Sequence, residues 1–345
     1  MNTHNSGRII YLDLLRIFAV FMVILLHTSA QNWGGYEVKT VYWVAINMYN
    51  GLSQYCVAIF VMISGTLFLN PNYKGDIATL YSKNIPRIII AYGFWSFIYV
   101  VKDYIISGYT LTPLNIIKGF LLGHYHLWFC FMIVGLYVVI PFLRKICQSV
   151  TLMRYFLLLS LIFTFACTTI MRFIPRIELL YGKMQFHFTL GYVPYYVLGY
   201  YLSNGVFSKK IKYSLYVLGI LSFIFSTVGS TLFSFYFNKP IGFANDFLLN
   251  ILFEAIAIYI FFKDHFINYN PEGKKSYIIK TISKASFGIY LVHALVIETM
   301  EYFGFSSISF CSLVAVPLVA VTVFVISLII SILLRKIPYI RRFVG

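Results

Sequence analysis

The chain of 345 residues is too apolar for a water-soluble globular protein, because 60% of its residues are hydrophobic, only 11% are charged and its mean hydropathy is +0.82. We therefore predict an integral membrane protein. The net charge of +16 does not indicate a nucleic-acid partner, since the basic residues form short clusters between apolar runs, where membrane orientation signals lie.

Apolar runs recur along the whole chain, each close to the roughly 20 residues that a helix needs to cross a bilayer. None alternates strictly between apolar and polar residues, as a strand of a membrane β-barrel does. The sequence predicts an all-α, polytopic membrane helical bundle of about ten transmembrane helices, in a single domain over residues 1–345. The expected spans are residues 9–31, 43–69, 86–107, 126–143, 153–171, 188–203, 213–237, 243–262, 282–303 and 309–334. Residues 113–125 are apolar but too short to span, so we expect them to lie in the outer interface or to re-enter the bundle.

The distribution of basic residues predicts that both termini are cytoplasmic. If the N-terminus is inside, 19 of the 27 basic residues fall in inside segments, seven fall in outside segments, and Arg16 lies within a span. Cytoplasmic segments of membrane proteins carry such an excess of Lys and Arg.

Arg16 and His27 are the first candidate functional residues. Eleven steps of 100° bring the two side chains to the same face of the first helix, about 16 Å apart along its axis. Ionisable side chains are costly against lipid, so this face is expected to point into the bundle. The structural alternative is that Arg16 pairs with Asp13 and that His27 is an interior histidine. The alignment of the two residues favours function.

A polar stripe is expected on the eighth span, where Asp246, Asn250 and Glu254 follow one another at intervals of four residues and should line a cavity. Glu298, near the outer end of the ninth span, could orient a base or the acceptor, and an interfacial location is the alternative.

His124 and His126 have a spacing that superficially suggests a metal site. No third ligand is convincing, so no metal is expected. His126 and Trp128 are instead expected to line the membrane interface or an acceptor site, because Trp favours the membrane boundary.

Four motifs resemble the membrane acyltransferase 3 family. In chain order they are Arg-x10-His preceded by YLDLL, FVMISGTLF (60–68), HLWFCFMIVGLYVVIPFLRK (126–145) and SFGIYLVHALVIE (286–298). The resemblance covers essentially the whole chain and is greatest to the compact single-domain members. His293 corresponds to the histidine of the family's Tyr-Leu-x-His motif, with a structural hydrogen bond to a neighbouring helix as the alternative role.

The resemblance implies an O-acyltransferase of the bacterial inner membrane that acetylates a cell-surface glycan or its lipid-linked precursor. The donor would be cytoplasmic acetyl-CoA or another acyl-CoA, with no permanently bound cofactor. Cations should hold the CoA phosphates, and Arg16, Lys83 and Arg87 are placed for this role. The family often has Arg-x-x-Arg at the start of the third span; here Arg87 matches, Lys83 is a substitute, and membrane anchoring is an equal alternative for both.

His27 is the candidate general base, because neutral imidazole has a pKa near the working pH. The alternative, that His27 accepts the acyl group covalently, is left open by the sequence. The competing functions are a transporter or flippase for a glycan intermediate, whose polar cavity would hold similar charges, and a membrane scaffold. The expected partners are acyl-CoA, the glycan acceptor and membrane lipid.

Overall fold

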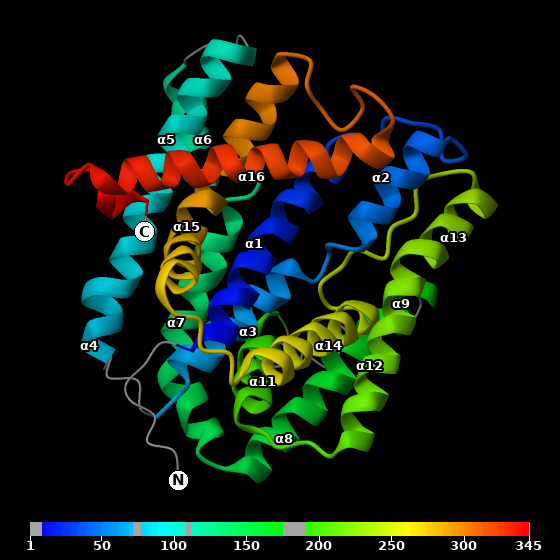
Figure 1. Ribbon diagram of the computed structural model, residues 1–345, viewed down its shortest axis with the longest axis vertical. Helices are drawn as coiled ribbons and strands as arrows, with labels where there is room; N and C mark the ends of the chain where they lie inside the picture. Colours follow the sequence, from blue (N-terminus) through cyan, green and yellow to red (C-terminus); the bar gives the residue numbers. More distant parts are fainter. Residues whose placement is uncertain (1–8, 72–76, 108–111, 175–190, 345) are drawn as a thin grey trace.

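The computed structural model describes residues 9–71, 77–107, 112–174 and 191–344, and within these ranges every regular element is helical (Figure 1). The first half of the chain forms α1 (Ile10–Ala30), α2 (Val41–Gly51), α3 (Cys56–Phe68), α4 (Ile77–Thr79), α5 (Ile85–Ser107), α6 (Pro113–Leu122), α7 (Trp128–Cys147), α8 (Val150–Ser160) and α9 (Cys167–Phe173). The second half forms α11 (Val193–Asn204), α12 (Lys209–Ile224), α13 (Ser230–Phe237), α14 (Leu249–Phe266), α15 (Gly273–Tyr302) and α16 (Ser312–Lys336). The predicted all-α fold is confirmed for the part of the chain that is described.

Within the described residues, seven helical segments are long and apolar enough to cross a membrane. They cover Ile10–Ala30, Val41–Phe68, Ile77–Ile106, Trp128–Cys147, Val150–Phe173, Lys209–Phe237 and Ser312–Lys336. The three other expected spans correspond to α11, α14 and the second part of α15, although residues 188–190 of the first of these lie outside the described ranges. The count of ten and the cytoplasmic location of the termini remain predictions.

The second expected span is not one continuous helix. The chain leaves the helical path after Gly51 and resumes it at Cys56, and Ser53 Oγ in between donates to the carbonyl of Tyr49 at 2.7 Å. Gly51 also packs so closely that a Cβ atom there would lie 2.6 Å from the Ser226 carbonyl oxygen. The break therefore coincides with a tight approach of the helical segment that contains Ser226.

α6 lies in the apolar segment 113–125, which was expected to be too short to span the membrane. Thr112 caps it by accepting a hydrogen bond from the backbone N–H of Asn115, and Pro113 occupies the first turn, where no N–H is needed. Its ten residues are too few to span a bilayer.

α1 lies near the middle of the molecule, with α5 and α6 on one side and α12 and α13 on the other (Figure 1). It packs against α2, α3, α14, α15 and α16. Contacts near both ends of α1 show that α15 runs parallel to it, since Asp13 bonds to Ser283 and Gln31 to Glu301. The central position of α1 brings the predicted Arg16–His27 face into the interior of the bundle.

Candidate functional site

A cavity of about 990 Å³ extends along the face of α1 that carries Arg16 and His27. Most of its wall comes from α1, α3, α5, α7 and α15. His126 from the segment before α7, Asp246 from the loop before α14 and Arg335 from the end of α16 also line it. The volume is in the range of pockets that hold small molecules. The two candidate residues of the first helix therefore line one continuous space.

Basic side chains gather at the end of this cavity near Arg16. Those in its wall are Arg16, Arg87, Lys284 and Arg335. One carboxylate, that of Asp13, lies among them in the wall. This end of the cavity has the charge required to hold a polyanion.

Arg16 is held at the cavity wall by its neighbours. Its Nη1 lies 4.0 Å from Asp13 Oδ1 and donates a 3.5 Å hydrogen bond to Ser283 Oγ, while Ser283 donates to the same Asp13 oxygen at 2.6 Å. The side chain remains 27% exposed. The predicted alternative, an ion pair with Asp13, is thus present, and it positions Arg16 in the cavity wall.

The opposite end of the cavity is lined by His27, His126, Trp128 and Asp246. Tyr192 donates a hydrogen bond to the Asp246 carboxylate, and the ring centroids of Tyr192 and Trp128 are 5.8 Å apart. Imidazole and carboxylate groups can form hydrogen bonds with hydroxyl groups, and an indole ring can pack against the face of a sugar ring. This end is therefore suited to a polar, uncharged ligand.

Four predicted site residues do not line the cavity, namely Lys83, Glu254, His293 and Glu298. Lys83 is exposed in the π-helical turn Leu80–Asn84 that precedes α5. Its neighbour Arg87, one turn further along, does reach the cavity.

Glu254 lies in a separate polar cluster between α14 and the α12–α13 segment. It is fully buried, and its Oε1 accepts a 2.5 Å hydrogen bond from Ser226, which also accepts one from Asn250 at 2.8 Å. The expected stripe on the eighth span is therefore divided, with Asp246 in the cavity wall and Glu254 in the cluster.

His293 is buried behind the cavity wall. Its ring centroid is 5.2 Å from that of His27 and 5.0 Å from that of His126, and its Nδ1 donates to the carbonyl of Tyr290 at 2.5 Å. It is therefore placed to support the two imidazoles that line the cavity.

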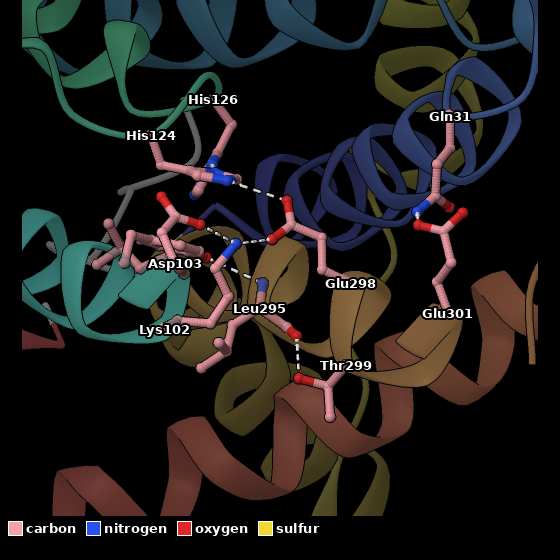
Figure 2. A network of polar contacts seen from close by, with 11 residues as sticks. Gln31, Lys102, Asp103, His124, His126, Leu295, Glu298, Thr299 and Glu301 are labelled. Atoms are coloured by element: carbon pink, nitrogen blue, oxygen red, sulfur yellow. Dashed lines mark hydrogen bonds and ion pairs between the residues drawn. The ribbon is translucent and has the colours of Figure 1, made fainter. Parts of the chain in front are cut away.

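Glu298 belongs to a polar network between α15 and α5 (Figure 2). It accepts hydrogen bonds from Lys102 and from His124 Nε2, the latter at 2.9 Å, and Lys102 also pairs with Asp103 at 2.5 Å. His124 in turn contacts His126, with 3.0 Å between their Nδ1 atoms. In the part of the chain that is described, no group of three or more His, Cys, Asp or Glu side chains is arranged to hold a metal ion.

Sequence reasoning missed Lys284 and Arg335 as cavity residues and His124 as a partner of Glu298. Basic residues at the positions of Lys284 and Arg335 are explained equally well as membrane orientation signals, so the sequence did not single them out as cavity residues. Arg335 donates to the Lys284 carbonyl, which joins the end of α16 to α15.

The profile of the acyltransferase 3 family, described as an acyltransferase domain, matches residues 9–336. No curated protein and no solved structure matches the chain. Because the family match covers nearly the whole chain and includes every residue of the cavity wall, the chain belongs to the acyltransferase 3 family of membrane acyltransferases.

Proposed function

We propose that this protein transfers an acyl group, acetyl in the simplest case, from acyl-CoA to a hydroxyl of a cell-surface glycan or its lipid-linked precursor. The observation that carries the proposal is that one cavity has basic residues at one end and His27 at the other. Family membership supports acyl transfer, and the distribution of charge supports the choice of donor.

The basic end suits coenzyme A, which carries several phosphate charges. The guanidinium of Arg16 offers two parallel N–H donors to a phosphate, and Arg87 and Arg335 line the same end. The pantetheine arm is long and slender, so the thioester would lie well away from the phosphates. The roughly 16 Å rise from Arg16 to His27 is of that order.

His27 acts as the general base in this mechanism. It removes the proton of the acceptor hydroxyl while the oxygen attacks the thioester carbonyl carbon, so that the C–O bond forms and the C–S bond breaks. The proton then passes from His27 to the CoA thiolate, which leaves as the thiol. The reaction needs no further reactant, because the proton lost by the hydroxyl is the proton gained by the thiolate.

The acceptor end suits a glycan. Asp246 can accept hydrogen bonds from hydroxyl groups, and Trp128 offers a ring face for a sugar. The protein would lie in the bacterial inner membrane with the basic end of the cavity on the cytoplasmic side, where acyl-CoA is found.

The test is release of CoA thiol by the purified protein, supplied with acetyl-CoA and candidate glycans, together with mass spectrometry of the glycan. We expect thiol release that depends on the glycan, and a glycan heavier by one acetyl group. Movement of the glycan across proteoliposomes without thiol release would instead support the transporter.

A further inference from the structure

Glu298, His124 and His126 form a hydrogen-bonded chain that leads to the wall of the cavity (Figure 2). Glu298 Oε1 lies 2.9 Å from His124 Nε2, and His124 Nδ1 lies 3.0 Å from His126 Nδ1. His126 lines the cavity, whereas Glu298 and His124 lie behind it. The chain therefore connects a carboxylate outside the cavity to an imidazole that faces it.

The direction of these hydrogen bonds determines where each imidazole carries its hydrogen. A carboxylate can only accept, so Nε2 of His124 is the donor to Glu298. In the neutral form of His124, Nδ1 then carries a lone pair and no hydrogen. Nδ1 of His126 must therefore be the donor in the hydrogen bond between the two rings. Nε2 of His126 is left as a hydrogen-bond acceptor.

This acceptor has no partner among the described residues. His126 is only 1% exposed, and its Nε2 is buried without a hydrogen bond. Leaving a buried acceptor unpaired costs free energy, which a ligand can recover by supplying a donor.

The surrounding residues hold the chain in place. Tyr99 stacks on His124, with ring centroids 4.1 Å apart and an interplanar angle of 12°, and Tyr290 donates a hydrogen bond to the backbone carbonyl of His126. Tyr99 is itself fixed to α15, because its hydroxyl donates to the Leu291 carbonyl at 2.9 Å. A recognition group held in this way requires little reorganisation when the ligand binds.

We propose that His126 recognises the acceptor. Its Nε2 accepts a hydrogen bond from a second sugar hydroxyl, beside the hydroxyl that reacts. Glu298 and His124 are positioning residues that hold His126 in the tautomer with hydrogen on Nδ1. The proposal rests on the proposed function and specifies the acceptor as a polyhydroxylated, uncharged part of a glycan. His27 and His126 both contact the ring of His293, at 5.2 and 5.0 Å between ring centroids, and both line the cavity, so the two imidazoles are close enough to contact one sugar ring. Asp246 is also an acceptor, so this end of the cavity favours ligands that donate.

The tautomer of His126 is tested directly, without any transfer assay, by NMR of the full chain labelled with ¹⁵N in its histidine rings. The signals of His126 are identified by their loss in His126→Asn. We expect the Nδ1–H form in the wild type and a mixture of tautomers in Glu298→Gln. The matched control is Glu301→Gln, which removes a carboxylate from the next turn of α15 that pairs with Gln31. A wild-type protein with hydrogen on Nε2, or a tautomer that does not respond to Glu298→Gln, would overturn the proposal.

Kinetics test recognition of the acceptor. In His126→Asn, the side-chain amide can still donate from near the position of Nδ1, but no acceptor remains at the position of Nε2. In His126→Gln, an amide oxygen can take the position of Nε2. We expect the KM for the glycan to rise roughly 10-fold in His126→Asn, to be partly restored in His126→Gln, and the KM for acyl-CoA to be unchanged in both. An unchanged glycan KM in His126→Asn would overturn the proposal. A wild-type protein that transfers nothing would contradict the proposed function instead, and the NMR result would still decide the positioning role of Glu298.

Discussion

The guanidinium of Arg16 and the carboxylate of Asp13 lie 4.0 Å apart, Nη1 to Oδ1, and Ser283 bonds to both groups. This arrangement holds the cation at the cavity wall without enclosing it. Arg16 is therefore positioned before any ligand arrives, which lowers the entropic cost of binding.

Arg16→Ala should weaken binding of a non-hydrolysable CoA analogue by roughly 10-fold or more, because a charge-assisted contact to phosphate is lost. Arg16→Lys should restore only part of the affinity, since an ammonium group cannot form the two parallel hydrogen bonds. Isothermal titration calorimetry measures both.

The control for Arg16 is Lys145→Ala, which removes an exposed cation at the end of α7 outside the cavity wall. If both variants lower the affinity equally, net charge and not the site determines donor binding. Unchanged affinity in a folded Arg16→Ala protein would remove Arg16 from the donor site.

His27→Ala should reduce the transfer rate by roughly 10²–10⁴-fold while the affinity for the CoA analogue remains close to that of the wild type. The physical reason is that the base acts on the acceptor hydroxyl and not on the phosphates. The assay is thiol release at saturating acyl-CoA.

A matched imidazole control is His265→Ala, since His265 is exposed on α14 and outside the cavity wall. Thermal unfolding of both variants reports on stability. A His27→Ala protein that is folded and transfers at the wild-type rate would exclude His27 as the base, and one that unfolds would support an interior structural role.

Arg335→Gln should weaken donor binding by several-fold, and the loss should be smaller at high salt, because partly exposed charges are screened. Lys336→Gln is the control, since it removes the adjacent charge, which does not line the cavity. Calorimetry at two ionic strengths distinguishes the variants. Equal behaviour of the two would show that Arg335 acts only through net charge.

The features that the sequence predicted well are determined by the geometry of a single helix. Arg16 and His27 share a face because helical geometry applies throughout α1. The polar stripe was less predictable, because α14 begins only at Leu249, and the helical interval from Asp246 to Asn250 does not hold in the loop before it. Asp246 and Glu254 consequently lie in different environments.

Contacts between segments that are distant in the sequence could not be predicted from the helical periodicity of the residues. Arg335 joins the cavity because the end of α16 meets α15 at Lys284, and His124 meets Glu298 across 174 positions of sequence. A single sequence gives the charge of such residues but not their neighbours. The sequence therefore predicted that the face of α1 with Arg16 and His27 points into the bundle, but it did not predict most of the residues that surround this face.

Reporter fusions test the predicted topology. The excess of basic residues in the expected inside segments predicts that fusions at both termini report a cytoplasmic location. A fusion after residue 39, between α1 and α2, should report the opposite side and serves as the internal control. A C-terminus on the outside would contradict the ten-span arrangement.

The contact between α3 and α11 should be highly sensitive to a single methyl group. A Cβ atom on Gly65 would lie 1.8 Å from the Tyr196 carbonyl oxygen, and one on Gly199 would lie 2.1 Å from that of Met62. These are backbone atoms that cannot move without separating the helices, so Gly65→Ala and Gly199→Ala should each destabilise the protein by about 1–3 kcal/mol or more.

Gly135→Ala is the matched control, because Gly135 also lies within a helix, α7, but its added Cβ would meet nothing within 4 Å. It should leave stability unchanged or raise it slightly, since Ala favours a helix more than Gly by about 1 kcal/mol. Because α3 contributes Val57, Phe60 and Ser64 to the cavity wall, the two destabilising variants should also lower donor affinity at temperatures below their unfolding transition. Unfolding midpoints for the three variants that agree within error would show that the close packing of α3 on α11 does not determine stability.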